Sequence, residues 1–406
     1  SSRMTKPSSP LEGNASARVA ALTPDNPYLS SGRKPRLLIV GAGMMGREHL
    51  RVSQLLGWAD VQGIVDPDGG SLEWACTDWR LLTDAPLTIY RDLSEACLDE
   101  AVDAIVIATP NHTHRDVLHA VAASRKPVLL EKPMATTLAD AMDIVNLARD
   151  YPAVIQLGMQ YRFKAQYVDA LQVVAAECAL GLVKTVAMSE YRPPFLDKVD
   201  QWNKFERLSG GTLVEKCCHY FDLINLMAKA RPQRVYASGG QAVNFLDFER
   251  NGVKSDIDDH AFVAIDYANA VRASFTLNMF CPDFAEELVV VGDAGRLKAE
   301  EYHDIHRSGS ASASLTLRLG ESGVSKTTDL TYPRTIEQSG HHGSTYFEHI
   351  ALMDRLEGKA VDSATPLQGM WAMVVASAAQ QSLATGQPVD VDTFIADNDL
   401  ASLLNH

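Results

Sequence analysis

The stretch 36–50 constrains this chain most, because a short apolar run there leads into glycines spaced G-x-G-x-x-G. Its first part, Leu37 to Val40, has the pattern of a strand buried on both faces of a parallel sheet. The three glycines then allow a tight turn, the approach of a pyrophosphate to the backbone, and close packing of a helix on the strand. Unpaired amides at the start of that helix suit an anion. The residues predicted to contact a dinucleotide here are Gly41, Gly43, Met44, Met45 and Gly46.

The second predicted strand, 61–65, ends at Asp66, which follows Gly46 by 20 residues. A carboxylate at this spacing accepts hydrogen bonds from the adenosine ribose of a dinucleotide. No arginine follows closely to hold a 2′-phosphate. The sequence therefore favours NAD over NADP as cofactor.

Length and charge set outer bounds on the protein. A chain of 406 residues is too long for one ordinary core and predicts two domains. Its net charge of −14 argues against nucleic acid or an anionic membrane as partner. No apolar run approaches the roughly 20 residues of a membrane span, so we expect no membrane contact.

The N-terminal segment and the cysteines bear on where the protein works. Residues 1–33 lack the apolar core of a secretory signal, and we expect either a tail or an arm that wraps a neighbouring subunit. The six cysteines show no C-x-x-C spacing, so we expect reduced thiols in a cytoplasmic protein. Histidine pairs such as His112 and His114 have no supporting set of ligands, and no metal site is predicted.

Two patterns of secondary structure divide the chain. Up to about residue 158, strands alternate with helices, which is typical of βαβ units and a parallel sheet. The strands predicted there are 37–40, 61–65, 87–90, 104–108, 127–130 and 153–157. The remainder predicts a helix over 162–181 and an open antiparallel sheet with strands at 183–191, 233–238, 259–267, 271–279 and 286–291. Helices over 344–357 and 365–385 close the chain.

Ligands of parallel sheets bind at the carboxyl ends of the strands, so each strand exit is informative. The fourth strand exits into the run 109–114, Thr-Pro-Asn-His-Thr-His, which we expect to lie over the cofactor. The fifth exits into Glu131-Lys132-Pro133. A lysine at this position points into the cleft, where burial and neighbouring cations lower a pKa towards an acid–base range. The alternative for Lys132 is an ordinary surface lysine.

The run 209–227, SGGTLVEKCCHYFDLINLM, is the most informative part of the second half. A helix is predicted from Thr212, on which Thr212, Glu215, His219 and Asp222 share one face because they are spaced by 3, 4 and 3 residues. A polar stripe beside an apolar one suits a helix that flanks a reaction cleft. The pattern Thr212-x-x-Glu215 also fits a capping box, so a purely structural role for this face stays open.

Taken together in this order, these motifs make the chain similar to a known family. Over about 36–390 it resembles the glucose-fructose oxidoreductase / inositol dehydrogenase (Gfo/Idh/MocA) family of NAD(P)-dependent enzymes. The motifs that carry the resemblance are GAGMMG, VDPD, ATPNHTH, EKP, GMQYRF, WNKFERLSGGTLVEKCCHYFD and ATGQPVDV. The chain departs from the family pattern at Glu215, Cys217 and Asn203, where aspartate, glycine and arginine are usual.

The resemblance implies an α/β fold. It consists of an N-terminal Rossmann domain with a parallel sheet (34–158) and a C-terminal α+β domain with a large open, mostly antiparallel sheet (159–406). It also implies a homo-oligomer, NAD as cofactor, and a Lys132–Pro133 bond of the kind that is often cis. The implied catalytic residues are Lys132, Glu215 and His219. The further positions expected to touch the cofactor are Thr109, Pro110, Asn111, His114, Glu131, Lys132, Gln160 and Trp202. Those expected to touch the substrate are Arg162, Lys198, Lys204, Thr212, Lys216 and His219.

Three functions remain open at this stage. The first is NAD-dependent oxidation of a sugar or polyol, with His219 as base, Lys132 polarising the oxygen, and Glu215 orienting them. The second is an NAD-dependent glycosidase that oxidises a sugar transiently, with Lys198, Lys204 and Lys216 binding an anionic, sulfonate-type group; solvated lysines are the alternative. The third is a non-catalytic NAD sensor, against which the presence of both Lys132 and His219 argues.

Overall fold

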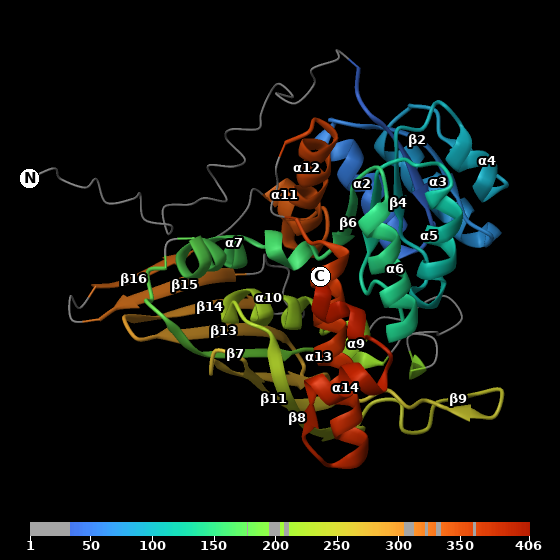
Figure 1. Cartoon of the computed structure of the whole chain (residues 1–406). Helices are drawn as coiled ribbons and strands as arrows, with labels where there is room; N and C mark the ends of the chain where they lie inside the picture. The colour runs from blue at the N-terminus through green and yellow to red at the C-terminus, as the bar shows by residue number, and fades with distance from the viewer. Residues whose placement is uncertain are drawn as a thin grey trace, which may run out of the picture.

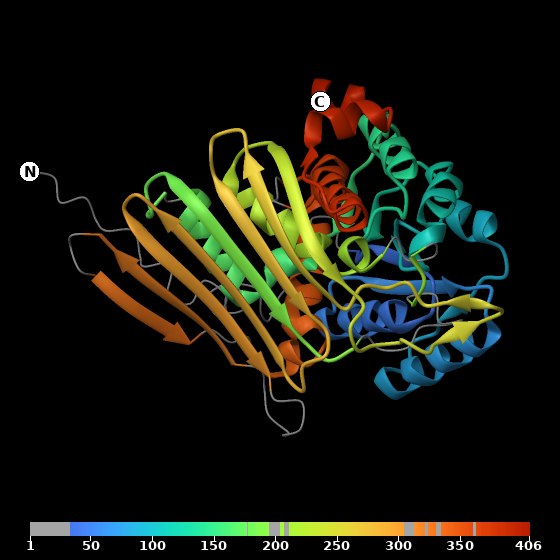
Figure 2. The same cartoon turned by 90° about the horizontal axis from the view of Figure 1, so that it is seen from below.

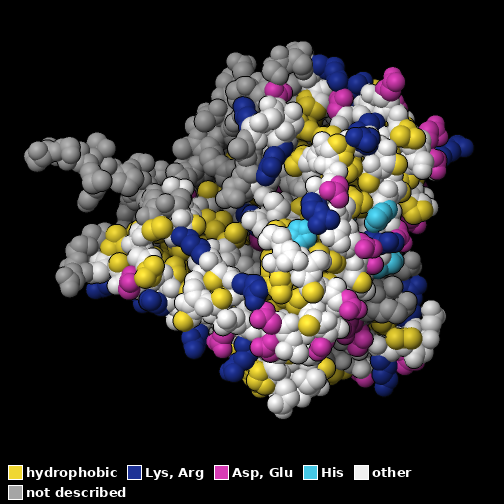
Figure 3. All heavy atoms as spheres, in the orientation of Figure 1, with side chains coloured by type: hydrophobic (Ala, Val, Ile, Leu, Met, Phe, Trp, Pro, Cys, Tyr) yellow, Lys and Arg dark blue, Asp and Glu magenta, His cyan; other side chains and the backbone are white. Residues whose placement is uncertain are grey.

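Two sheets organise the computed structural model, which describes residues 33–176, 178–194, 204–206, 211–303, 312–320, 324–329, 334–359 and 363–406. A parallel sheet with its helices forms the N-terminal part, and a larger sheet forms most of the remainder (Figure 1). Basic and acidic side chains are interspersed over the face that Figure 3 shows. No helix among the described residues is long and apolar enough to cross a membrane.

The parallel sheet has six strands in the order β3-β2-β1-β4-β5-β6, all pairs running parallel. The strands are β1 (Arg36–Val40), β2 (Asp60–Val65), β3 (Thr88–Ile89), β4 (Ala104–Ile107), β5 (Val128–Glu131) and β6 (Ile155–Gly158). The residues of β4, β5 and β6 are all buried, as the continuous apolar runs predict for strands covered on both faces. The order reverses between β1 and β4, which is where such sheets bind dinucleotides.

Helices cover this sheet and follow its strands in sequence: α2 (Met44–Leu56), α3 (Gly69–Leu82), α4 (Leu93–Leu98), α5 (His114–Ala122) and α6 (Leu138–Asp150). Side chains cap three of them, because Asp68, Asp92 and Thr137 each accept a hydrogen bond from a first-turn amide. A short 3₁₀ turn, Asn111–Thr113, precedes α5. The expected alternation of strands and helices is confirmed.

The larger sheet has nine strands in the order β16-β15-β14-β13-β7-β12-β11-β8-β17. They are β7 (Val183–Tyr191), β8 (Pro232–Gly240), β11 (His260–Tyr267), β12 (Arg272–Asn278), β13 (Phe284–Gly292), β14 (Gly295–His303), β15 (Ser312–Leu319), β16 (Val324–Asp329) and β17 (Val389–Asp390). Only the central pair β7–β12 is parallel, so the sheet is mostly antiparallel and the predicted fold class is confirmed. A separate hairpin pairs β9 (Glu249–Arg250) with β10 (Val253–Lys254).

Helices lie on one face of the nine-stranded sheet, and the view in Figure 2 shows strands without a helix in front of them. On the covered face lie α7 (Ala165–Leu171), α9 (Thr212–Glu215) and α10 (Cys218–Ala228). The predicted continuous helix over 162–181 is wrong. Lys164 is extended, with ψ of 139°, and separates the 3₁₀ turn η2 (Gln160–Phe163) from α7, which ends in a π-helical turn (Gln172–Ala176). The break lets the Lys164 ammonium reach two glutamates beneath it, as described below.

The C-terminal helices pack between the two sheets. These are α11 (Arg334–Glu337), α12 (Ser344–Leu356), α13 (Pro366–Thr385) and α14 (Val391–Asp397), with 3₁₀ turns at His341–Gly343 and Ala401–Asn405. Thr365 and Gln368 form a capping box at the start of α13. Gly369 on that helix allows close approach to β6, because a Cβ there would lie 2.2 Å from Leu157 Cδ2. Contacts of α12 with α2, and of α13 with α6, therefore hold the two parts together.

Candidate functional site

The three glycines after β1 are required for different reasons. Gly41 has φ of +104°, and a Cβ there would lie 2.4 Å from the carbonyl oxygen of Ala108. A Cβ at Gly46 would lie 2.0 Å from the carbonyl oxygen of Gly41, so helix and turn pack without space between them. A Cβ at Gly43 would meet nothing within 4 Å. The space at Gly43, beside the uncapped start of α2, fits a pyrophosphate.

Asp66 is fixed beside this turn at the end of β2. Its Oδ2 accepts a hydrogen bond of 2.7 Å from the amide of Ala42, and its Oδ1 accepts one of 2.7 Å from the amide of Asp68. A carboxylate has about four acceptor sites, so Asp66 retains capacity for a ribose. Arg47 places a cation beside this turn. Its Nε donates to the carbonyl of Gly43 at 3.4 Å, and its guanidinium stacks 3.7 Å from the Trp74 ring.

His114 ties the two strand-exit loops to each other. Its Nδ1 lies 2.7 Å from the carbonyl oxygen of Pro133, and its Nε2 lies 2.8 Å from that of Thr109. The ring is fully buried, and burial lowers the pKa of His114 against the opposing effect of the two carbonyls. The Lys132–Pro133 bond is cis, as the resemblance implied. His114 thus uses both ring nitrogens inside the protein, and places Thr109, Pro110 and Asn111 beside the lysine loop.

Glu131 lies at the interface between the two parts of the molecule. It is buried, and its Oε1 lies 2.6 Å from Nε2 of His49 on α2. Nδ1 of His49 in turn lies 2.7 Å from Nε2 of His349 on α12. The carboxylate of this expected cofactor contact is therefore engaged by a histidine chain, which fixes the end of β5 just before Lys132.

Two lysines converge on the turn between α9 and α10. Lys132 Nζ donates a hydrogen bond of 2.5 Å to the carbonyl oxygen of Glu215. Lys216 Nζ donates one of 3.0 Å to the hydroxyl of Tyr161. Burial, followed by the nearby cation Arg192, lowers the pKa of Lys216 to about 7. Lys216, which the sequence suggested as a contact for an anionic substrate, therefore has a pKa in the acid–base range.

His219 is the buried imidazole that the family resemblance implied as base. It is 1% exposed, and its ring stacks on that of Tyr161 with centroids 4.0 Å apart and planes 8° apart. Neither ring nitrogen has a hydrogen-bond partner in the part of the chain that the structure describes. Burial, then the charge of Lys132 and that of Lys216, hold the pKa of His219 well below its ordinary value. The ring is neutral at physiological pH and offers one donor and one acceptor to a ligand.

Gln160 is, like His219, a buried polar side chain with unpaired atoms among the described residues. It is 1% exposed, and both its amide oxygen and its amide nitrogen lack a partner among the residues that the structure describes. Buried polar groups are rarely left unpaired, because an unmade hydrogen bond costs about 1–3 kcal/mol. Gln160, which precedes Tyr161 in the chain, and His219, which stacks on Tyr161, therefore point to a ligand that completes their hydrogen bonds.

The predicted polar helix face is divided between two helices, because the chain turns at Lys216 and Cys217. Thr212 Oγ1 donates to the carbonyl of Asp258 at 2.7 Å, so the capping-box alternative is wrong. Glu215 is buried and supplies its carbonyl to Lys132.

The residues proposed to bind substrate fall into three groups. Arg162 is buried and forms two hydrogen bonds of 2.7 Å to Asp222, so its charge is neutralised inside the protein. Lys204 is also buried, 4.2 Å from the Phe248 ring centroid, and helps to pack the segment before β9. Lys216 belongs to the site itself. Lys198 and the expected cofactor contact Trp202 lie outside the described residues.

A buried ionic cluster lies beneath Tyr161 and gives no signal in the sequence. Lys164 Nζ lies 4.0 Å from the Tyr161 ring centroid, 3.3 Å from Glu286 Oε2 and 3.2 Å from Glu301 Oε2. Tyr220 donates to Glu286 at 2.8 Å, and burial raises the pKa of Glu286 to about 7. These partners come from η2, α10, β13 and β14, so only the tertiary fold brings them together.

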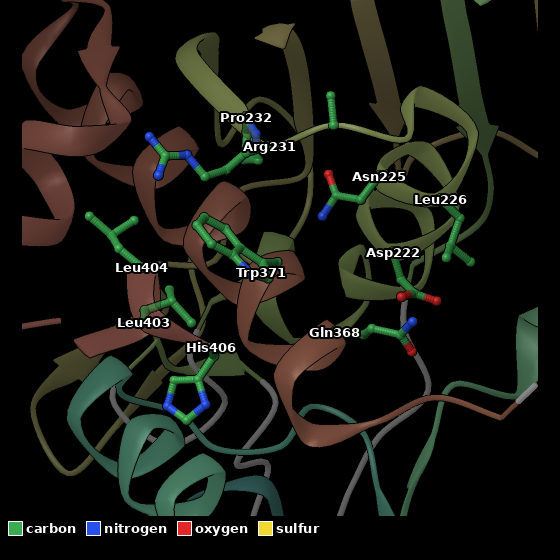
Figure 4. Close-up of a pocket in the computed structure, with 11 residues that line it drawn as sticks. Asp222, Asn225, Leu226, Arg231, Pro232, Gln368, Trp371, Leu403, Leu404 and His406 are labelled. Carbon is green, nitrogen blue, oxygen red and sulfur yellow. The ribbon is translucent and has the colours of Figure 1, made fainter. Parts of the chain in front are cut away.

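A cavity of about 340 Å³ lies beside the C-terminal half of α10 (Figure 4). Asn225, Arg231, Trp371, Leu404 and His406 are among the residues that line it. It reaches the site only through Asp222 and Gln368, both of which contact Arg162. Neither Lys132 nor His219 lines it, so this cavity is separate from the candidate site.

Comparison with known proteins covers both parts of the chain. The family model described as "Oxidoreductase family, NAD-binding Rossmann fold" matches residues 36–159, and the model described as "Oxidoreductase family, C-terminal alpha/beta domain" matches residues 176–391. The chain is 27% identical to the rhizopine catabolism protein MocA of Rhizobium meliloti over 198 residues, which is 48% of this chain and 58% of that protein.

Two further relatives extend the comparison. The inositol 2-dehydrogenase of Leifsonia xyli subsp. xyli is 36% identical over 255 residues, or 59% of this chain and 70% of that protein. The solved structure of levoglucosan dehydrogenase in complex with NADH and levoglucosan has a TM-score of 0.70 at 16% identity, over 88% of this chain and 100% of that chain. At this identity the structural likeness concerns the fold.

Proposed function

This chain belongs to the Gfo/Idh/MocA oxidoreductase family, and from that premise we propose that it transfers a hydride between a sugar or polyol carbon and NAD. NAD as the cofactor is confirmed by the family match of the Rossmann domain. The observation that best supports the proposal is His219, a buried neutral imidazole with no hydrogen-bond partner within the described ranges, three residues after Lys216. Similarity to an inositol 2-dehydrogenase supports a polyhydroxylated substrate.

The residues of the chain divide the work of the reaction. NAD, when bound, supplies the hydride acceptor; Gly43 leaves room for its pyrophosphate, and Asp66 has acceptor capacity for its ribose. Gln160 contributes unpaired amide atoms beside the site.

His219 takes the proton of the reacting hydroxyl as its carbon loses the hydride, since a neutral imidazole accepts a proton without prior change. Lys132 donates a hydrogen bond to the same oxygen and stabilises the negative charge that develops on it. The carbonyl of Glu215 holds Lys132 at the domain boundary. In this scheme Glu215 orients Lys132 through its backbone carbonyl.

A redox-assisted glycosidase with an anionic substrate is less well supported by the arrangement of the lysines. Lys204 packs against aromatic rings, Lys216 bonds to Tyr161, and Lys198 lies outside the described residues. The lysine cluster that would bind an anionic substituent therefore lacks support.

The test is the fate of the cofactor. Purified protein is incubated with NAD and a panel that contains myo-inositol, other polyols, free sugars and aryl glycosides, and absorbance at the NADH band is followed with product. We expect one NADH per oxidised sugar or polyol, and no signal from the Lys132→Met variant. Aglycone release that requires NAD yet yields no net NADH would overturn the proposal in favour of the glycosidase.

A further inference from the structure

Tyr161 occupies a central position in the site that the proposed chemistry leaves without a role. One face of its ring stacks on His219, with the centroids 4.0 Å apart, and its edge faces Tyr220. Its hydroxyl accepts the hydrogen bond from Lys216, 3.0 Å away. Lys216 is thus linked to the imidazole through one rigid aromatic ring.

The contact between Lys216 and Tyr161 is compatible with both protonation states of the lysine. Burial raises the pKa of Tyr161, so its hydroxyl keeps its proton. A charged ammonium donates to the phenol oxygen, and a neutral amine accepts from the phenol O–H. The pair therefore holds the ring in place through the pH range in which Lys216 titrates.

The charges that face His219 come from several elements. Lys132 lies at the end of β5, Lys216 at the turn before α10, Lys164 between η2 and α7, and His341 at the 3₁₀ turn before α12. Lys164 is neutralised by Glu286 and Glu301, and His341 lies 2.9 Å from Glu48 Oε2. Lys132 and Lys216 remain as the cations that act most directly on the imidazole, and both disfavour its protonated form.

We propose that Lys216 is a positioning residue of the reaction: it fixes the Tyr161 ring against His219, and its charge keeps the imidazole in the form that accepts a proton. This inference rests on the proposed function for its consequence in turnover. The geometric and electrostatic part concerns His219 itself and is measurable without a substrate.

A positioning role of Lys216 can be distinguished from simple packing of its side chain, because only the positioning role predicts a change in the titration of His219. Lys216→Gln removes the charge but retains a polar side chain, whereas Lys216→Arg retains the charge. Removing a neighbouring positive charge stabilises the imidazolium, so the titration of His219 moves to higher pH. Lys184→Gln serves as the matched control, because Lys184 is an exposed lysine on β7 outside the site.

The experiment is a histidine ring-carbon NMR titration of the full chain, in which the His219 signal is identified by its loss in His219→Leu. In Lys216→Gln we expect the ratio of protonated to neutral His219 at a given acid pH to rise about threefold or more. Lys216→Arg and Lys184→Gln are expected to match the unmodified protein. The acid limb of kcat/KM should move to higher pH by the same amount as the titration.

Each outcome is decisive. An unchanged His219 titration in Lys216→Gln would overturn the inference. A shifted titration in a protein that oxidises no sugar or polyol would support the positioning role and contradict the proposed function. If Lys216→Gln does not fold, Lys216→Met replaces it, because it removes the same charge with an unbranched apolar side chain that suits a buried position. We expect that variant to shift His219 in the same direction, and no shift would overturn the inference.

Discussion

Two buried polar groups on α10, one turn apart, are treated in opposite ways by the fold. Asp222 accepts two hydrogen bonds of 2.7 Å from Arg162, and that pair is 3% exposed on each side. His219 is equally buried, and neither ring nitrogen has a partner in the described part of the chain. Burial alone therefore does not distinguish the two groups; Asp222 and His219 differ in whether the protein completes their hydrogen bonds.

The same contrast between satisfied and unsatisfied buried groups is found elsewhere in the molecule. Lys164 lies between two glutamates and Glu131 faces His49, so those groups are satisfied within the protein. Gln160 and His219 are unsatisfied among the described residues; Gln160 precedes Tyr161 in the chain, and His219 stacks on its ring. We interpret the first set as a rigid support and the second as the surface that a ligand completes.

Breaking the paired group should have the largest effect on stability. Arg162→Met leaves Asp222 buried without its partner, which costs about 3–5 kcal/mol for pairs of this kind. The melting temperature should fall sharply. Arg272→Met is the matched control, because Arg272 and its partner Asp266 are 67% and 34% exposed, and a change within about 0.5 kcal/mol is expected there. Equal melting temperatures for the two variants would show that the Arg162 pair does not support the fold.

Replacing Lys132 tests, through activity, a residue that we assign to the reaction and not to the support of the fold. Its ammonium donates a hydrogen bond to the backbone carbonyl of Glu215 across the domain boundary. Lys132→Met should lower turnover by roughly 100-fold or more while the melting temperature and NAD affinity stay nearly unchanged. Steady-state kinetics, calorimetry and a fluorescence titration with NAD measure the three quantities. A variant that unfolds, or one that keeps its rate, would assign Lys132 to the structural set.

Asp66 is satisfied in part by the protein and in part open to a ligand, because two backbone amides occupy some of its acceptor capacity. Asp66→Ala should weaken NAD binding by roughly tenfold, about 1.4 kcal/mol, and weaken NADP much less, since the carboxylate repels a 2′-phosphate. Fluorescence titrations with both cofactors give the ratio. Tighter binding of NADP than of NAD by the unmodified protein would contradict the assignment and would direct attention to Arg47.

Glu348, on α12, is a further buried group whose hydrogen bonds are not completed by the described part of the chain. It is 1% exposed, and both carboxyl oxygens lack a hydrogen-bond partner among the residues described. Burial, then Glu131 and Glu48, raise the pKa of Glu348 well above its ordinary value. The folded state therefore keeps a proton that the unfolded state releases above about pH 4.5, so this group costs stability as the pH rises from there.

The replacement Glu348→Gln removes that cost. We expect its melting temperature to exceed that of the unmodified protein by roughly 2 °C or more at pH 8 and to equal it near pH 4. Turnover should be unchanged. A melting temperature that falls at pH 8 would mean that the Glu348 carboxylate is ionised and stabilised in the fold.

The cofactor half could be predicted from the sequence almost element by element. The G-x-G-x-x-G turn, the alternation of strands and helices, and Asp66 are local patterns, and β1, β2, β4 and β5 begin or end within about a residue of the predicted bounds. Even the helix cap at Thr137 follows from its position before an amphipathic run.

The second half was predicted less completely, because its features depend on partners distant in sequence. The break at Lys164 follows from Glu286 and Glu301, more than 120 residues later. The strands β14, β15 and β16, which lie at one end of the nine-stranded sheet, were not predicted. The link from Lys216 through Tyr161 to His219 arises only when η2 packs against α10.

His219→Leu tests the central contrast most directly, by differential scanning calorimetry and single-turnover NADH formation on the same sample. An unpaired imidazole contributes little to the fold, so replacing it with an apolar side chain should leave the melting temperature equal or higher. NADH formation from the best sugar or polyol should fall by roughly 100-fold or more. A melting temperature as low as that of Arg162→Met, or an unchanged rate of NADH formation, would contradict the account.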